Sequence, residues 1–144
     1  MQPAVPTEAR PCRFCSVDPA LQIASNDLAF ALRDRFPATP LHALVLPRRH
    51  VADYFGLSAE EREACAKLLH RLRLDILAAD PSVAGFNIGL NAGAVAGQTV
   101  FHSHIHLIPR RAGDVADPRG GVRHVIPGEG TRMLDVCPFK GQEG

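Results

Sequence analysis

The hydrophobic positions of the chain show helical spacing in one long stretch. This stretch starts at "LSAEE", where Ser58 can cap the first helical amides and Glu61, three residues on, completes a capping box. Asp80 and Pro81 close it. Its apolar positions keep the three-and-four spacing of a single buried face, namely Cys65, Leu68, Leu69, Leu72, Ile76 and Ala79. We therefore predict one long helix that buries one face.

Shorter apolar runs, bounded by turn residues, predict strands. The runs "LQIAS" and "DLAFAL" flank Asn26 and Asp27 and are typical of two short strands joined by a turn. Three further runs predict strands, namely "HALVLP" (42–47), "GFNIGLN" (85–91) and "VFHSHIHLIP" (100–109). Residues 1–19 predict a short helical or irregular arm, and the tail beyond Pro109 predicts extended or irregular structure. The predicted fold class is α+β, an antiparallel sheet of about five strands packed against one long helix.

The composition is that of one globular domain. The chain has 144 residues, of which 46% are hydrophobic and 22% charged, so it can bury a core without disulfides. No apolar run approaches the roughly 18 residues of a membrane span, and "MQPAVPTEARPCRFC" lacks the layout of a signal peptide. We therefore expect a cytoplasmic protein with no membrane partner. A formal net charge of +1 gives no basis for binding a nucleic acid polymer, so small ligands are the expected partners.

The candidate chemistry is concentrated in "TVFHSHIHLIPR" (99–110), where His102, His104 and His106 alternate with other residues. On an extended strand all three imidazoles point to one face. Metal binding, acid–base or nucleophilic chemistry and a partly polar core all suit such a row. The outer two positions would lie about 13 Å apart at the usual rise per residue, so the three cannot easily share one ion. Two adjacent members could share one, which would leave at least one free for other work.

Cys12 and Cys15 form a C-x-x-C pair, which can supply two corners of a tetrahedral zinc site. The other two ligands would then be histidines, and His50 after "LPRR" and one of the three clustered histidines are the candidates. A redox pair and two buried structural thiols are the alternatives.

The Gly-rich stretch "NIGLNAGAVAGQTV" runs directly into the histidine row. Gly93 and Gly97 allow the close backbone approach that suits phosphate oxygens, while Asn91, Gln98 and Thr99 add side-chain donors. A plain tight turn is the alternative. A neutral imidazole beside phosphate-binding amides suits nucleophilic attack on phosphorus, because histidine is substantially unprotonated at neutral pH.

These segments together resemble the histidine triad (HIT) superfamily. "HSHIHLI" (102–108) is similar to its His-x-His-x-His signature, "PLHALVLPRRHV" to its strand followed by Pro, two basic residues and His, and "NAGAVAGQTVFH" to its approach to the triad. "PCRFC" resembles the C-x-x-C of a zinc-containing bacterial branch, which is similar to histidine triad nucleotide-binding proteins and diadenosine polyphosphate hydrolases. The resemblance implies a single HIT domain over 1–144, with a core of about 12–110 and an extended tail at 111–144.

The resemblance also implies a role for each matching residue. His104 would be the nucleophile that forms a nucleotidyl-histidine intermediate, His106 would contact the scissile phosphate, and His42 would join a histidine hydrogen-bond relay. The expected phosphate and leaving-group contacts are Asn91, Gly97, Gln98 and Thr99. The expected ribose and base contacts are Asp34, Arg35 and Phe36.

For the cofactor, the resemblance implies a structural zinc. Its ligands would be Cys12, Cys15, His50 and His102, and four protein ligands close the site. The resemblance further implies a purine nucleotide or nucleotide conjugate as the substrate. It also implies a homodimer in which the helix and a central strand meet across a two-fold axis.

The predicted function is that of a nucleotide-binding phosphohydrolase. It would cleave at the α-phosphorus of a nucleoside phosphoramidate or dinucleoside polyphosphate and release a nucleoside monophosphate. One alternative is a nucleotidyltransferase of the same superfamily, whose related motif has glutamine as its third member, so His106 favours hydrolysis. The other is a zinc-stabilised nucleotide sensor or adaptor with little turnover, and the presence of His42, His104 and His106 argues against it.

Overall fold

The computed structural model describes residues 12–130, and the chain divides into two compact units. The first unit, Met1–Arg111, holds a five-stranded sheet and one long helix. The second unit is Ala112–Gly144. The ends of the predicted arm and tail, residues 1–11 and 131–144, lie outside the described residues. One domain over the whole chain therefore stays a prediction.

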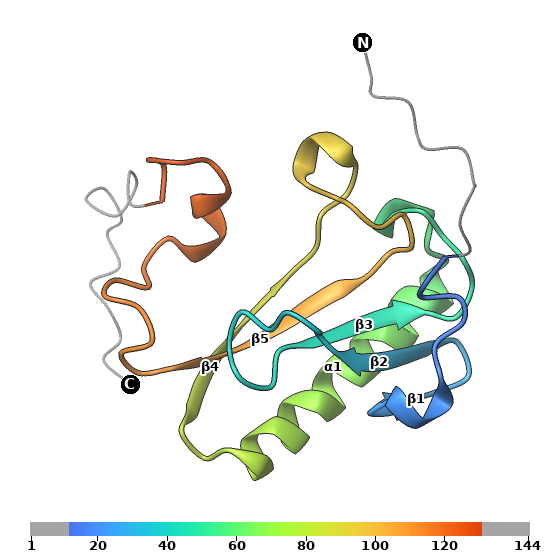
Figure 1. Ribbon diagram of the computed structural model, residues 1–144, viewed down its shortest axis with the longest axis horizontal. Coiled ribbons are helices and arrows are strands. Elements are labelled where there is room, and N and C mark those ends of the chain that lie inside the picture. Colours follow the sequence, from blue (N-terminus) through green and yellow to red (C-terminus); the bar gives the residue numbers. More distant parts are fainter. Residues whose placement is uncertain (1–11, 131–144) are drawn as a thin grey trace. The chain divides into compact units, whose positions relative to one another are not determined.

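The sheet is antiparallel throughout, and its strand order is β1-β2-β3-β5-β4 (Figure 1). The strands are β1 (Ala24–Ser25), β2 (Ala29–Arg33), β3 (Ala43–Pro47), β4 (Val83–Gly89) and β5 (Ile105–Arg111). The predicted turn joins β1 to β2, because Asn26 Oδ1 accepts the Ala29 N–H at 2.9 Å. All five residues of the central β3 are buried. The predicted α+β class, an antiparallel sheet with one long helix, is thus confirmed.

The helix α1 spans Ala59–Ala79, and its start is the predicted capping box. The Ser58 hydroxyl accepts the Glu61 N–H at 3.1 Å, and the Glu61 carboxylate accepts the Ser58 N–H at 2.9 Å. The fully buried members of the predicted face are Cys65, Leu68, Leu72 and Ile76. Leu69 is half-buried and Ala79, the last helical residue, is exposed. The last fully buried residue is therefore Ile76, three residues before the end of the helix.

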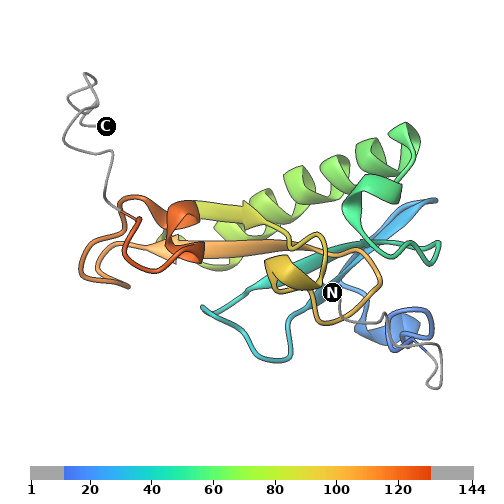
Figure 2. The ribbon, with the colours of Figure 1, turned by 90° about the horizontal axis from the view of Figure 1, so that it is seen from above.

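The two faces of the sheet have different covers. Ala31, Val45 and Leu107 pack with α1 in one apolar cluster. Strand residues whose side chains point to the other face, such as Phe30 and Leu44, form a second cluster with Phe14 of the N-terminal segment. Figure 2 shows α1 on one side of the sheet and the loop between β2 and β3 on the other. Since His106 alternates with Ile105 and Leu107, its imidazole lies on the face away from α1.

The predicted strand at 100–109 begins later than expected, because β5 starts at Ile105 and continues to Arg111. His102 and His104 therefore lie before the strand, and only His106 lies in it. The Ser103 N–H donates to Val51 O at 2.7 Å, so this segment pairs with the loop after β3 instead of extending the ladder. The small-residue loop at 92–98 contains one turn of 3-10 helix, η3, at Ala94–Ala96.

The tail prediction agrees with the described part of the second unit. It consists of turns and one 3-10 helix, η4 (Gly121–Val125), and an ion pair joins Arg119 to Asp117 at 2.9 Å. Within residues 12–130, no helix has both the length and the apolar character that a membrane crossing requires.

Candidate functional site

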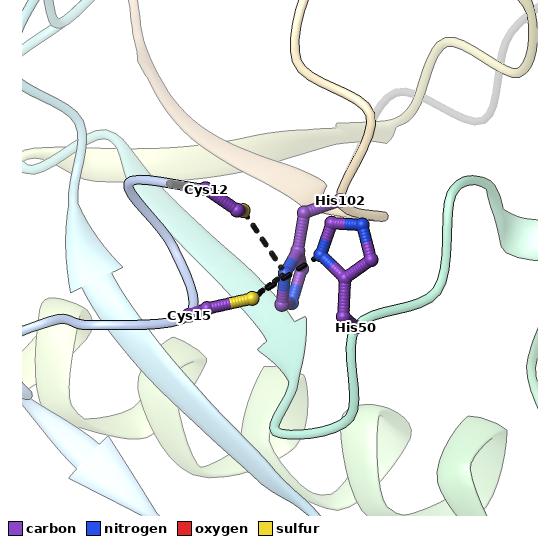
Figure 3. Close-up of side chains that lie close together, drawn as sticks. All are labelled: Cys12, Cys15, His50 and His102. Atoms are coloured by element: carbon purple, nitrogen blue, oxygen red, sulfur yellow. Dashed lines mark hydrogen bonds between the residues drawn. The ribbon is translucent and has the colours of Figure 1, made fainter. Parts of the chain in front are cut away.

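Four side chains from three separate segments meet at one edge of the first unit (Figure 3). They are Cys12 and Cys15 of the N-terminal segment, His50 of the loop after β3, and His102 of the segment before β5. One donor atom from each lies within 4.8 Å of the others. The sequence pattern left open which of the clustered histidines would join the cysteine pair, and the structure brings His102 to it.

The distances between the donor atoms fit a tetrahedral metal site. Cys15 Sγ lies 3.2 Å from His50 Nδ1 and 3.6 Å from His102 Nδ1, and Cys12 Sγ lies 3.5 Å from His102 Nδ1. A tetrahedral zinc ion, with bonds of about 2.3 Å to sulfur and about 2.0 Å to nitrogen, requires sulfur–nitrogen separations of about 3.5 Å. The four side chains can therefore hold a metal ion, and two thiolates with two imidazoles are a donor set that zinc accepts.

Neighbouring groups orient the two histidines of this cluster. The His102 Nε2–H donates to Pro47 O at 2.8 Å, which leaves Nδ1 unprotonated and directed to the cysteines. Arg49, the residue before His50, donates hydrogen bonds to both carboxylate oxygens of Glu61, at 2.7 and 3.2 Å. This ion pair fastens the loop that carries His50 to the first turn of α1.

A hydrogen bond determines which nitrogen of His104 carries the proton. Its Nδ1 lies 2.9 Å from the carbonyl oxygen of His102, and a carbonyl can only accept. The proton of a neutral His104 therefore sits on Nδ1, and Nε2 carries the lone pair. The side chain is half-buried, and its ring lies 5.5 Å from the ring of Phe14 and 5.3 Å from that of His106.

A second chain of hydrogen bonds fixes the tautomer of His106. The Ala38 N–H donates to His42 Nδ1 at 3.0 Å, so a neutral His42 carries its proton on Nε2. That Nε2–H donates to His106 Nδ1 at 2.9 Å, which leaves the His106 proton on Nε2. Burial lowers the pKa of His42, and the charge of Asp34 opposes the shift only in part. Burial, followed by His104 and His42, lowers the pKa of His106, so both imidazoles are neutral at pH 7.

Asp34, His42 and His106 also place donor atoms within 4.8 Å of one another. Asp34 Oδ2 lies 3.5 Å from His42 Nε2 and 3.8 Å from His106 Nδ1. However, because His42 Nδ1 accepts the Ala38 N–H, the proton of the neutral imidazole is on Nε2. This Nε2–H is a donor and cannot ligate a metal. This second cluster is therefore a hydrogen-bond relay, with Asp34 as an additional acceptor beside it.

The Gly-rich loop is fastened to the fold by Gln98. This side chain is buried, donates to Ala52 O and Val100 O, and accepts the Gly93 N–H at 2.9 Å. The amide group of Gln98 is thus largely occupied by hydrogen bonds to backbone groups. Gly93 and Gly97 have φ values of 95° and 94°, which favour glycine at both positions.

The remaining predicted contacts are open to solvent. Asn91, Gly97 and Thr99 are exposed, and a Cβ added at Gly97 would come within 3.8 Å of the Asn91 side chain. Arg35 is exposed, and 82% of Phe36 is accessible. The Phe36 N–H donates to Asp34 Oδ1 at 2.8 Å, which orients the carboxylate. Within residues 12–130, none of these exposed side chains contacts the histidines, and their roles stay predictions.

Three contributors to the site carry no sequence signal. They are the ring of Phe14, which contacts His102 and His104, the amide of Ala38, which contacts His42, and the carbonyl of Pro47, which contacts His102. In the sequence, Phe14 is only one of the two unspecified residues of the C-x-x-C motif. The other two act through backbone groups that every residue type possesses, apart from the amide that proline lacks.

Comparison with known proteins places the chain in a family. The family model described as HIT domain matches residues 16–113. A HIT-like protein of Mycoplasma genitalium is 35% identical over 104 residues, which cover 69% of this chain and 72% of that protein. The adenylylsulfatase HINT3 of Arabidopsis thaliana is 30% identical over 109 residues, which cover 72% of this chain and 54% of the plant protein.

A solved structure shows the same fold. The crystal structure of a hypothetical histidine triad nucleotide-binding protein from Sulfolobus tokodaii is similar with a TM-score of 0.66 and 30% sequence identity. The similarity covers 74% of this chain and 73% of that chain.

Proposed function

Because the chain belongs to the HIT family, we propose that it is a nucleotide-binding hydrolase that acts at the α-phosphorus of its substrate. The substrates we propose are nucleoside phosphoramidates or dinucleoside polyphosphates, from which a nucleoside monophosphate is released. Two relatives support this class, since one is named an adenylylsulfatase and the other a nucleotide-binding protein. The observation that carries the proposal is the hydrogen bond from His104 Nδ1–H to His102 O, which leaves the lone pair of the neutral ring on Nε2.

His104 is the nucleophile in this proposal. Its Nε2 forms a bond to phosphorus while the bond to the leaving group breaks, and the leaving group departs with the bonding electron pair, the amine also taking a proton from solvent. A water molecule then attacks the same phosphorus and gives a proton to solvent, while the bond to Nε2 breaks with its electron pair returning to Nε2 and the monophosphate is released. The hydrogen bond to the His102 carbonyl stabilises the positive imidazole ring that forms in the first step.

His106 and His42 supply a fixed hydrogen-bond donor. The outward Nε2–H of His106 donates to a non-bridging oxygen of the scissile phosphate, where negative charge is held during transfer. The relay from the Ala38 amide through His42 keeps that proton in place. The exposed Asn91, Gly97 and Thr99 are the proposed phosphate and leaving-group contacts. Gln98 supports them by fixing the Gly-rich loop, through its bonds to Ala52 and Gly93.

The nucleoside is held, in this proposal, by the loop after β2. Asp34 accepts hydrogen bonds from the ribose hydroxyls, and the exposed Arg35 and Phe36 contact a purine base. We also propose that the protein is a homodimer and that it is cytoplasmic. Measurement of the mass of the protein in solution tests whether it is a dimer.

Zinc is the proposed structural cofactor. Cys12, Cys15, His50 and His102 would hold it, and their donor separations support this set. With four protein ligands the ion would cross-link three chain segments and would leave no position for substrate.

The experiment that tests the function compares His104→Ala with the wild-type protein. Each is incubated with adenosine 5′-phosphoramidate and with diadenosine polyphosphates, and release of AMP is measured. His70→Ala is the matched control, because it removes an exposed histidine of α1. We expect the control to keep wild-type turnover and His104→Ala to lose at least 100-fold, the order of magnitude that removal of a nucleophile produces.

Two results would change the conclusion. Unchanged turnover in His104→Ala would end the assignment of the nucleophile. Failure of the wild-type protein to release monophosphate from any of these compounds, while it still binds nucleotide, would favour the sensor or adaptor.

A further inference from the structure

We propose that Phe14 is a positioning residue for His104, so that the C-x-x-C segment which would bind the metal also sets the orientation of the nucleophile. The inference deepens the proposed function and depends on it, because His104 is the nucleophile only there. Phe14 has no group that can donate or accept a proton, so its contribution is through contact alone.

The ring of Phe14 stands against two of the three clustered histidines. Its centroid lies 5.5 Å from that of His104, at an interplanar angle of 56°, and 6.0 Å from that of His102, at 78°. Tilted and edge-on contacts at these separations are the favourable arrangements of aromatic rings. The same side chain therefore contacts the proposed nucleophile and a member of the metal cluster.

Phe14 is itself held firmly. Only 8% of the residue is exposed, and it packs with Phe30, Leu32, Leu44 and Leu46 on the face of the sheet away from α1. The Arg13 guanidinium lies 5.0 Å from the ring centroid. Cys12 and Cys15 flank the residue on both sides in the chain, so a metal ion bound by them would restrain the backbone of Phe14 from both ends.

His104 needs such a contact, because within the described residues a single hydrogen bond holds its ring. This bond joins Nδ1 to His102 O. A carbonyl oxygen accepts over a broad range of directions, so this bond alone does not stop the ring from turning about Cβ–Cγ, which carries Nδ1 away from the carbonyl and lets its proton exchange between the two nitrogens. Rotation would move Nε2, the atom that attacks phosphorus. The ring of Phe14 restricts this rotation by occupying the space beside the imidazole.

The test compares Phe14→Leu with Phe30→Leu. Both variants replace a buried phenylalanine of the same apolar cluster, but Phe30 has no recorded contact with a histidine in the described structure. Zinc content and melting temperature are measured for each, and then kcat and KM for AMP release from adenosine 5′-phosphoramidate. We expect kcat of Phe14→Leu to fall about tenfold to 100-fold below that of Phe30→Leu, with KM within twofold, since small displacements of a reacting group cost rates of this order.

Long-range 1H–15N NMR of the imidazoles provides a readout that a loss of stability alone would not move. In the wild-type protein and in Phe30→Leu, His104 should be one tautomer with the proton on Nδ1. In Phe14→Leu we expect averaged shifts of the two nitrogens. Should Phe14→Leu fail to fold, Phe14→Met, whose unbranched side chain adapts to an irregular space, takes its place in both measurements.

Either of two results overturns the proposal. One is a kcat of Phe14→Leu within twofold of that of Phe30→Leu, and the other is a single Nδ1–H tautomer of His104 in Phe14→Leu. If the wild-type protein releases no monophosphate, the proposed hydrolase function fails, and the NMR comparison alone decides whether Phe14 orients His104.

Discussion

Removal of one metal ligand by Cys12→Ser should destabilise the fold by an amount that the loop lengths indicate. A metal that joins Cys12 to His102 closes a loop across 90 positions, and one that joins Cys15 to His50 closes a loop across 35. A permanent cross-link over the longer loop would lower the conformational entropy of the unfolded chain by an equivalent of about 4 to 5 kcal/mol. A metal gives less, because unfolded cysteines and histidines also bind it. Phe14, packed on the sheet, already restrains this segment.

We therefore expect Cys12→Ser and removal of the metal each to cost about 3 kcal/mol, which lowers Tm by about 10 °C for a chain of this length. Calorimetry with and without a strong chelator measures the effect, and metal analysis follows the zinc. Cys65→Ala is the control, since Cys65 is buried in α1 outside the cluster and burial raises the pKa of its thiol to about 11. This control should retain its sensitivity to chelator. A zinc-free wild-type protein that melts within about 2 °C of the zinc-loaded one would refute the reasoning.

Two further predictions concern charge. Because burial lowers the pKa of His42 and His106, both imidazoles should take up a proton only as the pH drops below 6.5, and an NMR titration in which either of them inflects above 6.5 would contradict the relay. The same shifts make the unfolded chain bind more protons just below pH 6.5, so stability also decreases there as the pH falls. Glu61→Gln keeps the cap but loses the charge paired with Arg49, and it should lower the free energy of unfolding in chemical denaturation at pH 7 by only a modest amount, because Arg49 is largely exposed to solvent. Since Arg49 lowers the pKa of Glu61 below 4.5, this difference should disappear as the pH falls below 4.5, and Glu63→Gln, which loses only a solvent-exposed pair with Lys67, should show a smaller difference at pH 7.

The helix and most strands were predictable because their signals are local. The capping box at Ser58, the spacing of apolar residues through Ile76, and the turn residues after β1 each act within a few positions of the chain. The start of β5 was not predictable in this way. The Ser103 amide bonds to Val51, which is distant in sequence, and the apolar pattern gives no sign of this interaction.

The candidate site shows the same division. A C-x-x-C pair and alternating histidines identify the ligand and nucleophile types, but spacing alone left open which histidine joins the cysteines. The choice of His102 depends on Pro47 O, which directs Nδ1 to the cysteines. Gln98 was predicted as a ligand contact from its side-chain type, yet its bonds to Ala52 and Gly93 become visible only in the folded chain.

Two backbone groups of opposite polarity give His104 and His106 opposite roles. The His102 carbonyl accepts the Nδ1 proton of His104, so the outward Nε2 of His104 is an acceptor. The Ala38 amide donates to His42, which in turn donates to His106 Nδ1, so the outward Nε2 of His106 is a donor. Two identical side chains, two positions apart, thereby hold a lone pair and a proton on their Nε2 atoms when both rings are neutral. In the proposed mechanism, attack on phosphorus requires the first and stabilisation of phosphate charge the second, so the main chain would assign these roles before any substrate arrives.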